Sequence, residues 1–289
     1  MARISRTEAE ARGLLCKSHL RQERLKPAPG QTAAGEAWFR RGWAPVYDRA
    51  LCVPLRPYRP ATPAQAAALK EGRALVGTSP CNRCGERVDT EDLVRGICVR
   101  CWSAEASATA RAWLDAAPLV LDTETTGLGD DAEVIEISVI DVHGEVLLDT
   151  LVRPSGAIPA EVSAIHGITD DDVATAPTWA EIHPRLVELV AGQLVIAYGA
   201  DFDMRLIEQT ASRHGLSWAR PESGCAMRLY AQHNGEWSDR RSTWRWLKLG
   251  VAAEACGIDA GGAHRALADC KMTLGVIRAM SADALQNLS

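Results

Sequence analysis

Residues 118–128 read Pro118-Leu-Val-Leu-Asp122-Thr-Glu124-Thr-Thr-Gly127-Leu128. The apolar start of this segment predicts a short buried strand. Since alternate residues of a strand project to the same face, Asp122 and Glu124 direct two carboxylates the same way at its end. Such a pair repels and loses solvation unless a divalent cation with oxygen ligands compensates. The segment predicts a sheet with an acidic strand end, although acids at strand ends are common and this pair alone is weak support.

The rest of the carboxy-terminal part alternates between strand and helix patterns. Apolar runs predict further strands, and apolar residues at helical spacing predict helices. Three strands followed by helix, strand and helices indicate an α/β domain, a sheet with helices on its faces. The expected strands are 134–141, 145–152 and 193–197, and the expected helices are 104–116, 179–190, 204–213, 244–256 and 266–280.

Two later segments carry further acids. Asp201 and Asp203 follow the strand expected at 193–197, and the carboxyl end of a strand is the usual place for a site in an open sheet. Their spacing leaves both as candidates. His264 and Asp269 are five residues apart, which on one helix would separate them by about 140°. They can converge only if His264 precedes the helix and Asp269 lies within it.

These segments together resemble the DEDDh branch of the DEDD exonuclease superfamily, which includes proofreading subunits of bacterial replicative polymerases, ribonuclease T and oligoribonuclease. The similarity extends beyond the acids to Asp122–Leu128, Ile158–Thr169 and His264–Asp269, in the same order as in that family. It implies a ribonuclease-H-like fold, a mixed five-stranded sheet flanked by helices, in a domain at residues 116–282. An inactive relative is the main alternative, but all five expected positions are filled.

The resemblance implies a 3′→5′ exonuclease that hydrolyses phosphodiester bonds with two Mg²⁺ or Mn²⁺ ions and releases nucleoside 5′-monophosphates. It selects Asp203 over Asp201, because the family's acid follows a phenylalanine. Histidine, with an ordinary pKa of about 6.5, suits His264 for taking the proton of the attacking water. The four acids implied to hold the metal ions, with Asp122 bridging them, are Asp122, Glu124, Asp203 and Asp269.

The same resemblance implies contacts to the last nucleotide of the substrate. Ile165 and His166 match positions that pack on the terminal base and sugar. The sequence departs from the family at Tyr198-Gly199, where many relatives have His-Asn; the ring of Tyr198 can stack on a base. Glycine after the first strand permits close approach of the backbone to the substrate. The remaining expected contacts are Thr125, Thr126, Gly127 and Leu128.

Four of the nine cysteines form two CxxC pairs with thirteen residues between them. This spacing predicts a zinc ribbon at residues 76–103, in which four thiolates hold one structural Zn²⁺ and leave no open position. A redox dithiol pair and an iron site use the same thiolates and are the alternatives. Arginines around the pairs favour contact with nucleic acid, and docking of a protein partner is the other common use of such a ribbon. The cysteines are Cys81, Cys84, Cys98 and Cys101.

Charge divides the chain. Residues 1–115 carry 19 Lys and Arg against 12 Asp and Glu, whereas residues 116–289 carry 13 against 25. A basic module at 1–75 beside an acidic domain indicates that polyanion affinity and acidic chemistry are separated, with ordinary surface solvation as the alternative. A proline-rich stretch at 54–63 predicts a linker. The aromatic residues of the module serve either as a small core or as a stacking surface; they are Trp38, Trp43, Tyr47 and Tyr58.

No apolar run approaches the length of about eighteen residues that a membrane span needs, and the first residues lack the apolar core of a signal peptide. We therefore expect a cytoplasmic protein that binds no membrane. Its expected partner is nucleic acid, DNA more than RNA, at single strands or 3′ ends. An exoribonuclease of the same branch and a non-catalytic nucleic-acid adaptor are the competing interpretations. Sequence does not separate DNA from RNA, because recognition of the 2′-OH depends on the geometry of the pocket.

Overall fold

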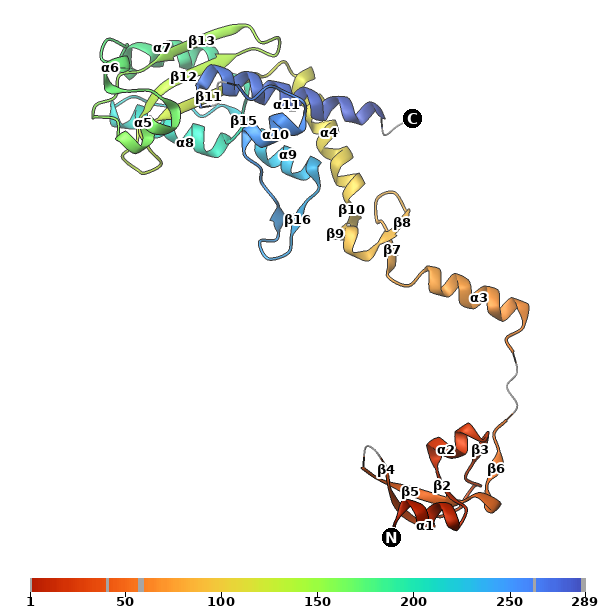
Figure 1. The fold of residues 1–289 in the computed structure, drawn as a ribbon. Helices are drawn as coiled ribbons and strands as arrows, with labels where there is room; N and C mark the ends of the chain where they lie inside the picture. Colours follow the sequence, from red (N-terminus) through yellow and green to blue (C-terminus); the bar gives the residue numbers. More distant parts are fainter. Residues whose placement is uncertain (1, 40–41, 57–59, 262–263, 287–289) are drawn as a thin grey trace. The chain divides into compact units, whose positions relative to one another are not determined.

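The computed structural model describes residues 2–39, 42–56, 60–261 and 264–286. It contains two compact units, Met1–Ala74 and Leu75–Ser289. The larger unit holds the cysteine pairs and the acidic segments, and the smaller one holds the basic amino-terminal residues (Figure 1). Tyr58, one of the aromatic residues considered above, lies outside the described part of the chain.

A five-stranded sheet forms the centre of the larger unit. Its strands are β11 Leu119–Thr125, β12 Val134–Ile140, β13 Val146–Leu151, β14 Leu194–Ala197 and β15 Glu222–Cys225. The order is β13-β12-β11-β14-β15 (Figure 1). β12 is antiparallel to β11 and β13, while β14 is parallel to β11 and β15. The predicted α/β fold with a mixed five-stranded sheet is therefore confirmed.

Helices cover both faces of this sheet. They are α4 Val99–Asp115, α5 Ala160–His166, α6 Asp170–Val173, α7 Trp179–Val190, α8 Ala200–Arg213, α9 Ala226–Asn234, α10 Leu249–Ala255 and α11 Ala266–Gln286. One hydrophobic core joins the sheet to α7 and α8, and the other joins it to α4, α9, α10 and α11. Among the helices that the structure describes, none combines the length and apolarity that a membrane crossing requires.

The two cores fix which way the acids of β11 face. Leu121 packs into the core beneath α7 and α8, whereas Val120 packs with Cys270 and other residues of α11. Because side chains alternate along a strand, Asp122 shares the face of Val120 and lies on the α11 side. Glu124 follows it on that side. The hydrophobic pattern of β11 thus aims two carboxylates at the start of α11.

The segment between α8 and α11 differs from the prediction. It contributes the edge strand β15 and helix α9, neither of which was expected. Trp244 belongs to a hairpin of β16 Trp237–Ser238 and β17 Thr243–Trp244, and α10 begins only at Leu249. The predicted helix at 244–256 is therefore wrong over its first turn. The reason is local pairing: Trp237 lies opposite Trp244, and this cross-strand aromatic pair stabilises the hairpin.

The cysteine pairs lie among short paired strands and at the start of α4, which contains Cys101. The strands are β7 Thr78–Pro80 with β8 Arg87–Asp89, and β9 Leu93–Val94 with β10 Ile97–Cys98, separated by the 3₁₀ turn η2 Thr90–Asp92. Helix α4 starts directly after Cys98, earlier than the expected residue 104. It packs against α9 and α11, and Arg111 donates a hydrogen bond to the Ser281 carbonyl at 2.8 Å. The segment after the cysteines is therefore part of the larger unit's core.

The smaller unit has its own sheet and core. Its elements are β1 Arg3–Ile4, α1 Arg6–Ala11, β2 Leu14–Cys16, α2 Lys17–Gln22, β3 Leu25–Lys26, β4 Gly35–Phe39, β5 Gly42–Asp48, η1 Arg49–Leu51, β6 Val53–Pro54 and α3 Pro63–Ala74. Four strands pair in the order β1-β4-β5-β2. Tyr47 is buried, whereas Trp38 and Trp43 face each other on the exposed surface. The aromatic residues therefore divide between core and surface.

Candidate active site

Three carboxylates converge from two elements. Asp122 and Glu124 come from β11, and Asp269 lies in the first turn of α11. Their ligand oxygens lie within 4.8 Å of one another. Such a set of oxygen donors is what Mg²⁺ and Mn²⁺ prefer. This is a candidate site for a divalent cation.

A fourth carboxylate, Asp203, lies beside them. It stands in the first turn of α8 with only 3% of its surface exposed. Thr123 Oγ1 donates a hydrogen bond to its Oδ1 at 2.8 Å, which ties α8 to β11. Asp201 instead points to solvent, where it forms ion pairs with Arg220 and Arg228. Of the two acids that spacing left open, Asp203 is the one in the cluster.

The crowding of acids is visible in their titration. Burial raises the pKa of Asp122 well above its usual range, and the charge of Asp203 adds to this effect. Burial likewise raises the pKa of Glu124 to about 8, with Asp269 as the strongest charged neighbour. It raises the pKa of Asp203 to about 7 despite the hydrogen bond from Thr123, and that of Asp269 to about 6. Without a compensating cation, this site favours protonated acids.

His264 occupies the loop immediately before α11. Its backbone has φ of +66°, a conformation uncommon for a residue with a side chain, and its N–H donates to Asp269 Oδ1 at 3.3 Å. The imidazole is exposed. The five-residue spacing is thus resolved as the geometry requires, with His264 outside the helix and Asp269 inside it.

An ion pair that the sequence reasoning missed fixes this loop. Glu136 of β12 lies opposite Glu124 in the sheet and is buried. The guanidinium of Arg265 donates to both carboxylate oxygens of Glu136, with Nη2 at 2.6 Å from Oε1. The Ala266 N–H donates to the same carboxylate at 2.9 Å. Glu136 therefore holds the residue after His264 and caps the start of α11.

A signal for this ion pair was present in the sequence. Glu136 is the only charged residue in the otherwise apolar stretch Val134–Ile140. A carboxylate in a strand buried along its whole length needs a partner. The partner itself was not predictable, because Arg265 lies more than a hundred residues further along the chain.

The segment after the β11 acids forms a tight turn. Thr125 Oγ1 donates to the Gly127 carbonyl at 2.7 Å, and Thr126 Oγ1 accepts the Glu133 N–H at 2.9 Å. Leu128 is 78% exposed, and Ile165 on α5 is 61% exposed. Single exposed apolar side chains are common on protein surfaces, and these two are accessible to a partner.

His166, the last residue of α5, is buried. Its Nδ1 accepts the Ile168 N–H at 3.0 Å, and its Nε2 has no hydrogen bond of regular geometry within the described residues. Burial lowers the pKa of His166, an effect that the nearby Thr125 backbone and Glu136 oppose. The His166 ring is thus held inside the fold, beside the Thr125 backbone at the carboxyl end of β11.

The expectation for Tyr198 is corrected. Only 7% of its surface is exposed, and its ring belongs to the core beneath α9 and α11. Its hydroxyl donates to the Leu247 carbonyl at 2.8 Å. With both faces packed and the hydroxyl bonded, the ring has no surface on which a base can stack. Tyr198 is a core residue in this fold.

The four cysteines of the CxxC pairs form a second cluster. Their sulfur atoms lie within 4.8 Å of one another. The backbone N–H groups of Arg83 and Cys98 point at Cys81 Sγ, at 3.4 and 3.3 Å. Gly85, directly after the first pair, and Gly96, two residues before the second, adopt positive φ angles that suit tight turns. Four convergent sulfur ligands with N–H donors around them fit a tetrahedral metal site.

Comparisons with known proteins agree with this geometry. An exonuclease of Escherichia phage 186, CP81, is 48% identical over 186 residues, which cover 62% of this chain and 95% of that protein. The DNA polymerase III subunit epsilon of Aquifex aeolicus is 29% identical over 167 residues, which cover 55% of this chain and 78% of the subunit. A structure of exonuclease X with 5′-overhanging duplex DNA has 26% identity and a TM-score of 0.43, covering 57% of this chain and 91% of that one.

The match to a family model spans the domain described above. The model of the RNase_T exonuclease family fits residues 119–277, from the first residue of β11 into α11. This range includes Asp122, Glu124, Asp203 and Asp269, as well as His264. It covers more than half of the chain, and the protein therefore belongs to the RNase_T exonuclease family.

Proposed function

We propose that the protein is a 3′→5′ exonuclease that removes nucleotides from the 3′ end of DNA and releases nucleoside 5′-monophosphates. One observation carries the proposal: Asp122, Glu124 and Asp269 converge from β11 and α11, the buried Asp203 of α8 lies near Asp122, and His264 stands in the adjoining loop. The family supplies the class of reaction, hydrolysis by an exonuclease. Relatives named as DNA polymerase III epsilon subunits favour DNA and the 3′ end.

The donor set fits divalent ions. Asp122, Glu124, Asp203 and Asp269 offer only oxygen atoms, and their raised pKa values record a negative charge without a counter-charge. We assign these four acids as the ligands of Mg²⁺ or Mn²⁺, with Asp122 central because it faces the other three. When bound, such ions lower the pKa of a coordinated water and neutralise charge on the phosphate and the leaving oxygen.

His264 is assigned as the general base. Its exposed imidazole is open to solvent, and histidine is the side chain most often used to accept a proton near neutral pH. The main chain of His264 is tied to Asp269, and Glu136 fixes Arg265 next to it. These contacts restrain the backbone that positions the imidazole. Such restraint is needed because a misplaced base loses much of its effect.

The segment after β11 is assigned to the terminal nucleotide. Leu128 and Ile165 expose apolar side chains on which a base or sugar can pack. Gly127 permits close approach of the main chain, and the buried His166 ring lies beside Thr125. Thr126 braces the turn through Glu133. A pocket for a chain end, rather than an open groove, is what an exonuclease needs.

The cysteine cluster is assigned one structural Zn²⁺. All four ligand positions are sulfur atoms of the chain, so no position is left for water or substrate. Because α4 begins within the second CxxC pair and continues into the core of the larger unit, such an ion would fix the start of that helix.

The polarity is tested with single-stranded DNA labelled at its 5′ or 3′ end, incubated with Mg²⁺, Mn²⁺ or EDTA. The 5′-labelled strand should shorten stepwise, and the 3′ label should appear at once as a mononucleotide. Early release of a 5′-labelled mononucleotide would reverse the assigned direction. Equal products from Asp122→Ala and wild-type protein would show that the activity is not from this site, and faster digestion of RNA than of DNA would overturn the substrate.

His264→Ala tests the role of the imidazole. Removal of a general base costs roughly 10²–10⁴-fold in rate, whereas binding of Mn²⁺, measured by calorimetry, should persist because the carboxylates are untouched. A wild-type rate over a range of pH would contradict the assignment. Loss of Mn²⁺ binding would instead make His264 a structural or ligand residue.

A further inference from the structure

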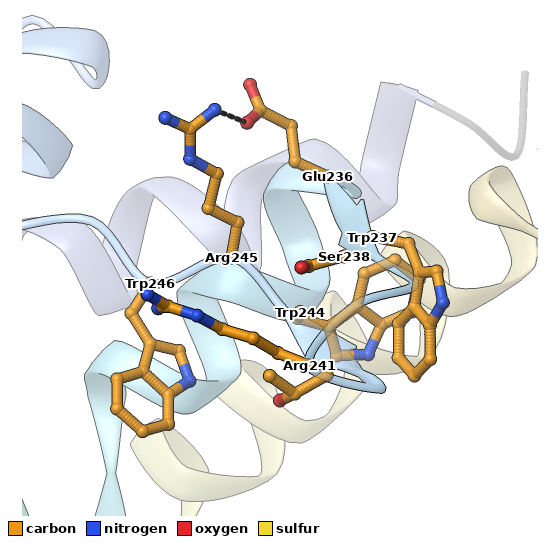
Figure 2. Close-up of a pocket in the computed structure, with 8 residues that line it drawn as sticks. Glu236, Trp237, Ser238, Arg241, Trp244, Arg245 and Trp246 are labelled. Atoms are coloured by element: carbon orange, nitrogen blue, oxygen red, sulfur yellow. Dashed lines mark hydrogen bonds and ion pairs between the residues drawn. The ribbon is translucent and has the colours of Figure 1, made fainter.

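A pocket lies at the hairpin of β16 and β17; Glu236 lines it, but none of the four acids of the candidate active site does (Figure 2). Its volume is about 590 Å³. Tryptophan and arginine side chains dominate its walls; they are Trp237, Trp244, Trp246, Arg241 and Arg245. Nothing assigned above to hydrolysis uses these residues.

Two of the pocket's tryptophans make contacts that stabilise the fold. Trp237 and Trp244 meet edge to face across the hairpin, with ring centroids 5.1 Å apart, and Trp102 at the start of α4 contacts Trp244 at 5.9 Å. Arg95 lies over the Trp237 ring and Arg83 over the Trp102 ring. These contacts join the hairpin to the cysteine-rich segment. They hold the walls of the pocket in fixed positions before any ligand arrives.

The remaining residues are not engaged in this way. Trp246 is 52% exposed, and no described ring or cation contacts it. Arg241 makes no ion pair with any residue that the structure describes, and its side chain extends across the pocket toward Trp246 (Figure 2). Arg245, by contrast, is paired with Glu236 at 3.2 Å. A free aromatic face and a free guanidinium thus stand side by side.

We propose that this pocket binds unpaired nucleic acid, with a base stacked on Trp246 and a backbone phosphate at Arg241. Tryptophan faces accept any base, and arginine neutralises the phosphate that follows it. Both groups line the same pocket. An acidic peptide would use Arg241 but leave the large Trp246 face without a planar partner. The pocket would hold the substrate strand at a distance from the carboxylates.

The consequence is a difference between long and short substrates. A strand long enough to reach both sites gains affinity from the pocket, whereas a mononucleotide ester occupies only the carboxylate site. The pocket should therefore change KM for oligonucleotides and leave hydrolysis of the ester untouched. This distinction separates the inference from the proposed polarity and substrate of the catalytic site.

The test measures binding of a fluorescein-labelled oligothymidylate by anisotropy, in EDTA, with Asp122→Ala protein so that nothing is cleaved. Trp246→Ala should weaken binding about tenfold, within the range for loss of one stacking partner. Trp246→Phe should retain most of the affinity. Arg241→Gln should weaken binding and reduce its dependence on salt by about one phosphate contact.

Two matched controls carry exposed residues of the same unit. Val251→Ala shortens an exposed apolar side chain on α10, and Arg185→Gln removes an exposed charge on α7. Both should bind as the parent does. If Trp246→Ala and Arg241→Gln also bind within about twofold of the parent, a difference below 0.5 kcal/mol, the inference is wrong. It is equally wrong if either variant impairs hydrolysis of the p-nitrophenyl ester of thymidine monophosphate while oligonucleotide binding is unchanged.

Discussion

The carboxylate cluster and the cysteine cluster each gather four potential metal ligands, but they are built in opposite ways. The cysteines lie within one short segment, Cys81 to Cys101, on turns and strand ends that follow one another. The carboxylates come from β11, α8 and α11, from Asp122 to Asp269. The first cluster is local, while the second exists only when the whole domain is folded.

The electrostatics differ as well. Backbone N–H groups point at Cys81 Sγ and stabilise a thiolate there. The carboxylates have buried like charges as neighbours, and burial keeps the pKa of Glu124 at about 8 and that of Asp203 at about 7. The carboxylate cluster therefore opposes the fold until a cation binds. In the cysteine cluster the effects are mixed, because burial and the neighbouring cysteines raise the pKa of Cys101 to about 12.

The largest expected effect follows from Asp122→Asn. This change keeps the shape of the side chain but removes the most crowded charge. Hydrolysis should fall roughly 10³-fold or more, as for loss of an essential member of a catalytic unit. In EDTA the melting temperature should rise, because a buried repulsive charge has gone. A variant that is inactive but less stable than the parent would show that the carboxylates do not oppose the fold.

The cysteine cluster should respond in the reverse way. Cys98→Ser should release one metal ion per chain and lower the free energy of unfolding by roughly 3 kcal/mol or more, because a structural metal adds its binding free energy to folding. Hydrolysis of a mononucleotide ester should persist. Metal content by mass spectrometry and thermal melts measure both, with Cys52→Ser, outside the cluster, as control. An unchanged metal content would show that the four cysteines do not hold a metal ion.

Loss of the ion pair between Glu136 and Arg265, which joins the sheet to the loop of His264, should have an intermediate effect. Glu136→Gln leaves Arg265 without its charged partner, which should lower the free energy of unfolding by about 2 kcal/mol and kcat about tenfold. KM should change little, since Glu136 does not face the substrate segment. Glu145→Gln, at an exposed turn, is the control. Equal behaviour of the two variants in melts and kinetics would show that Glu136 does not position the loop.

The smallest effect concerns pH. The raised pKa values of Glu124, Asp203 and Asp269 mean that the metal-free native state retains protons that the unfolded chain has lost. Stability without metal should therefore fall as pH rises from about 5 to about 8. Mg²⁺ competes with these protons for the carboxylates. The rise in the protein's melting temperature that Mg²⁺ causes should therefore become larger as pH increases over the same window. A stabilisation by Mg²⁺ that is constant with pH would contradict the raised pKa values.

Much of the site followed from the sequence because its determinants are local. Alternation along β11 placed Asp122 and Glu124 on one face, and the spacing of His264 and Asp269 required a loop before a helix. The cysteine pairs are local by nature. What the sequence left out depends on distant partners: Arg265 closes on Glu136 from across the sheet, and Tyr198 is buried by helices that follow it in the chain.

The secondary structure of two segments was predicted wrongly for a related reason. β15 is short and contains Ser223 and Gly224, so it carries no strand pattern of its own and forms by pairing with β14. The residues before α10 fit a helical pattern, but the Trp237–Trp244 pair draws Trp244 into a hairpin. Tertiary pairing decided both segments.

The packing of α4 affects where the chain can be cut. At Gly224 a Cβ atom would lie 2.6 Å from the Trp113 and Ile196 side chains, so the glycine of the edge strand β15 lets α4 lie directly on the sheet. A protein truncated at residue 119, where the match to the exonuclease family model begins, would lack α4 and expose the apolar face that this helix covers. Exposed apolar surface promotes association with other chains, so such a fragment would be prone to aggregate, and α4 protects the domain against self-association.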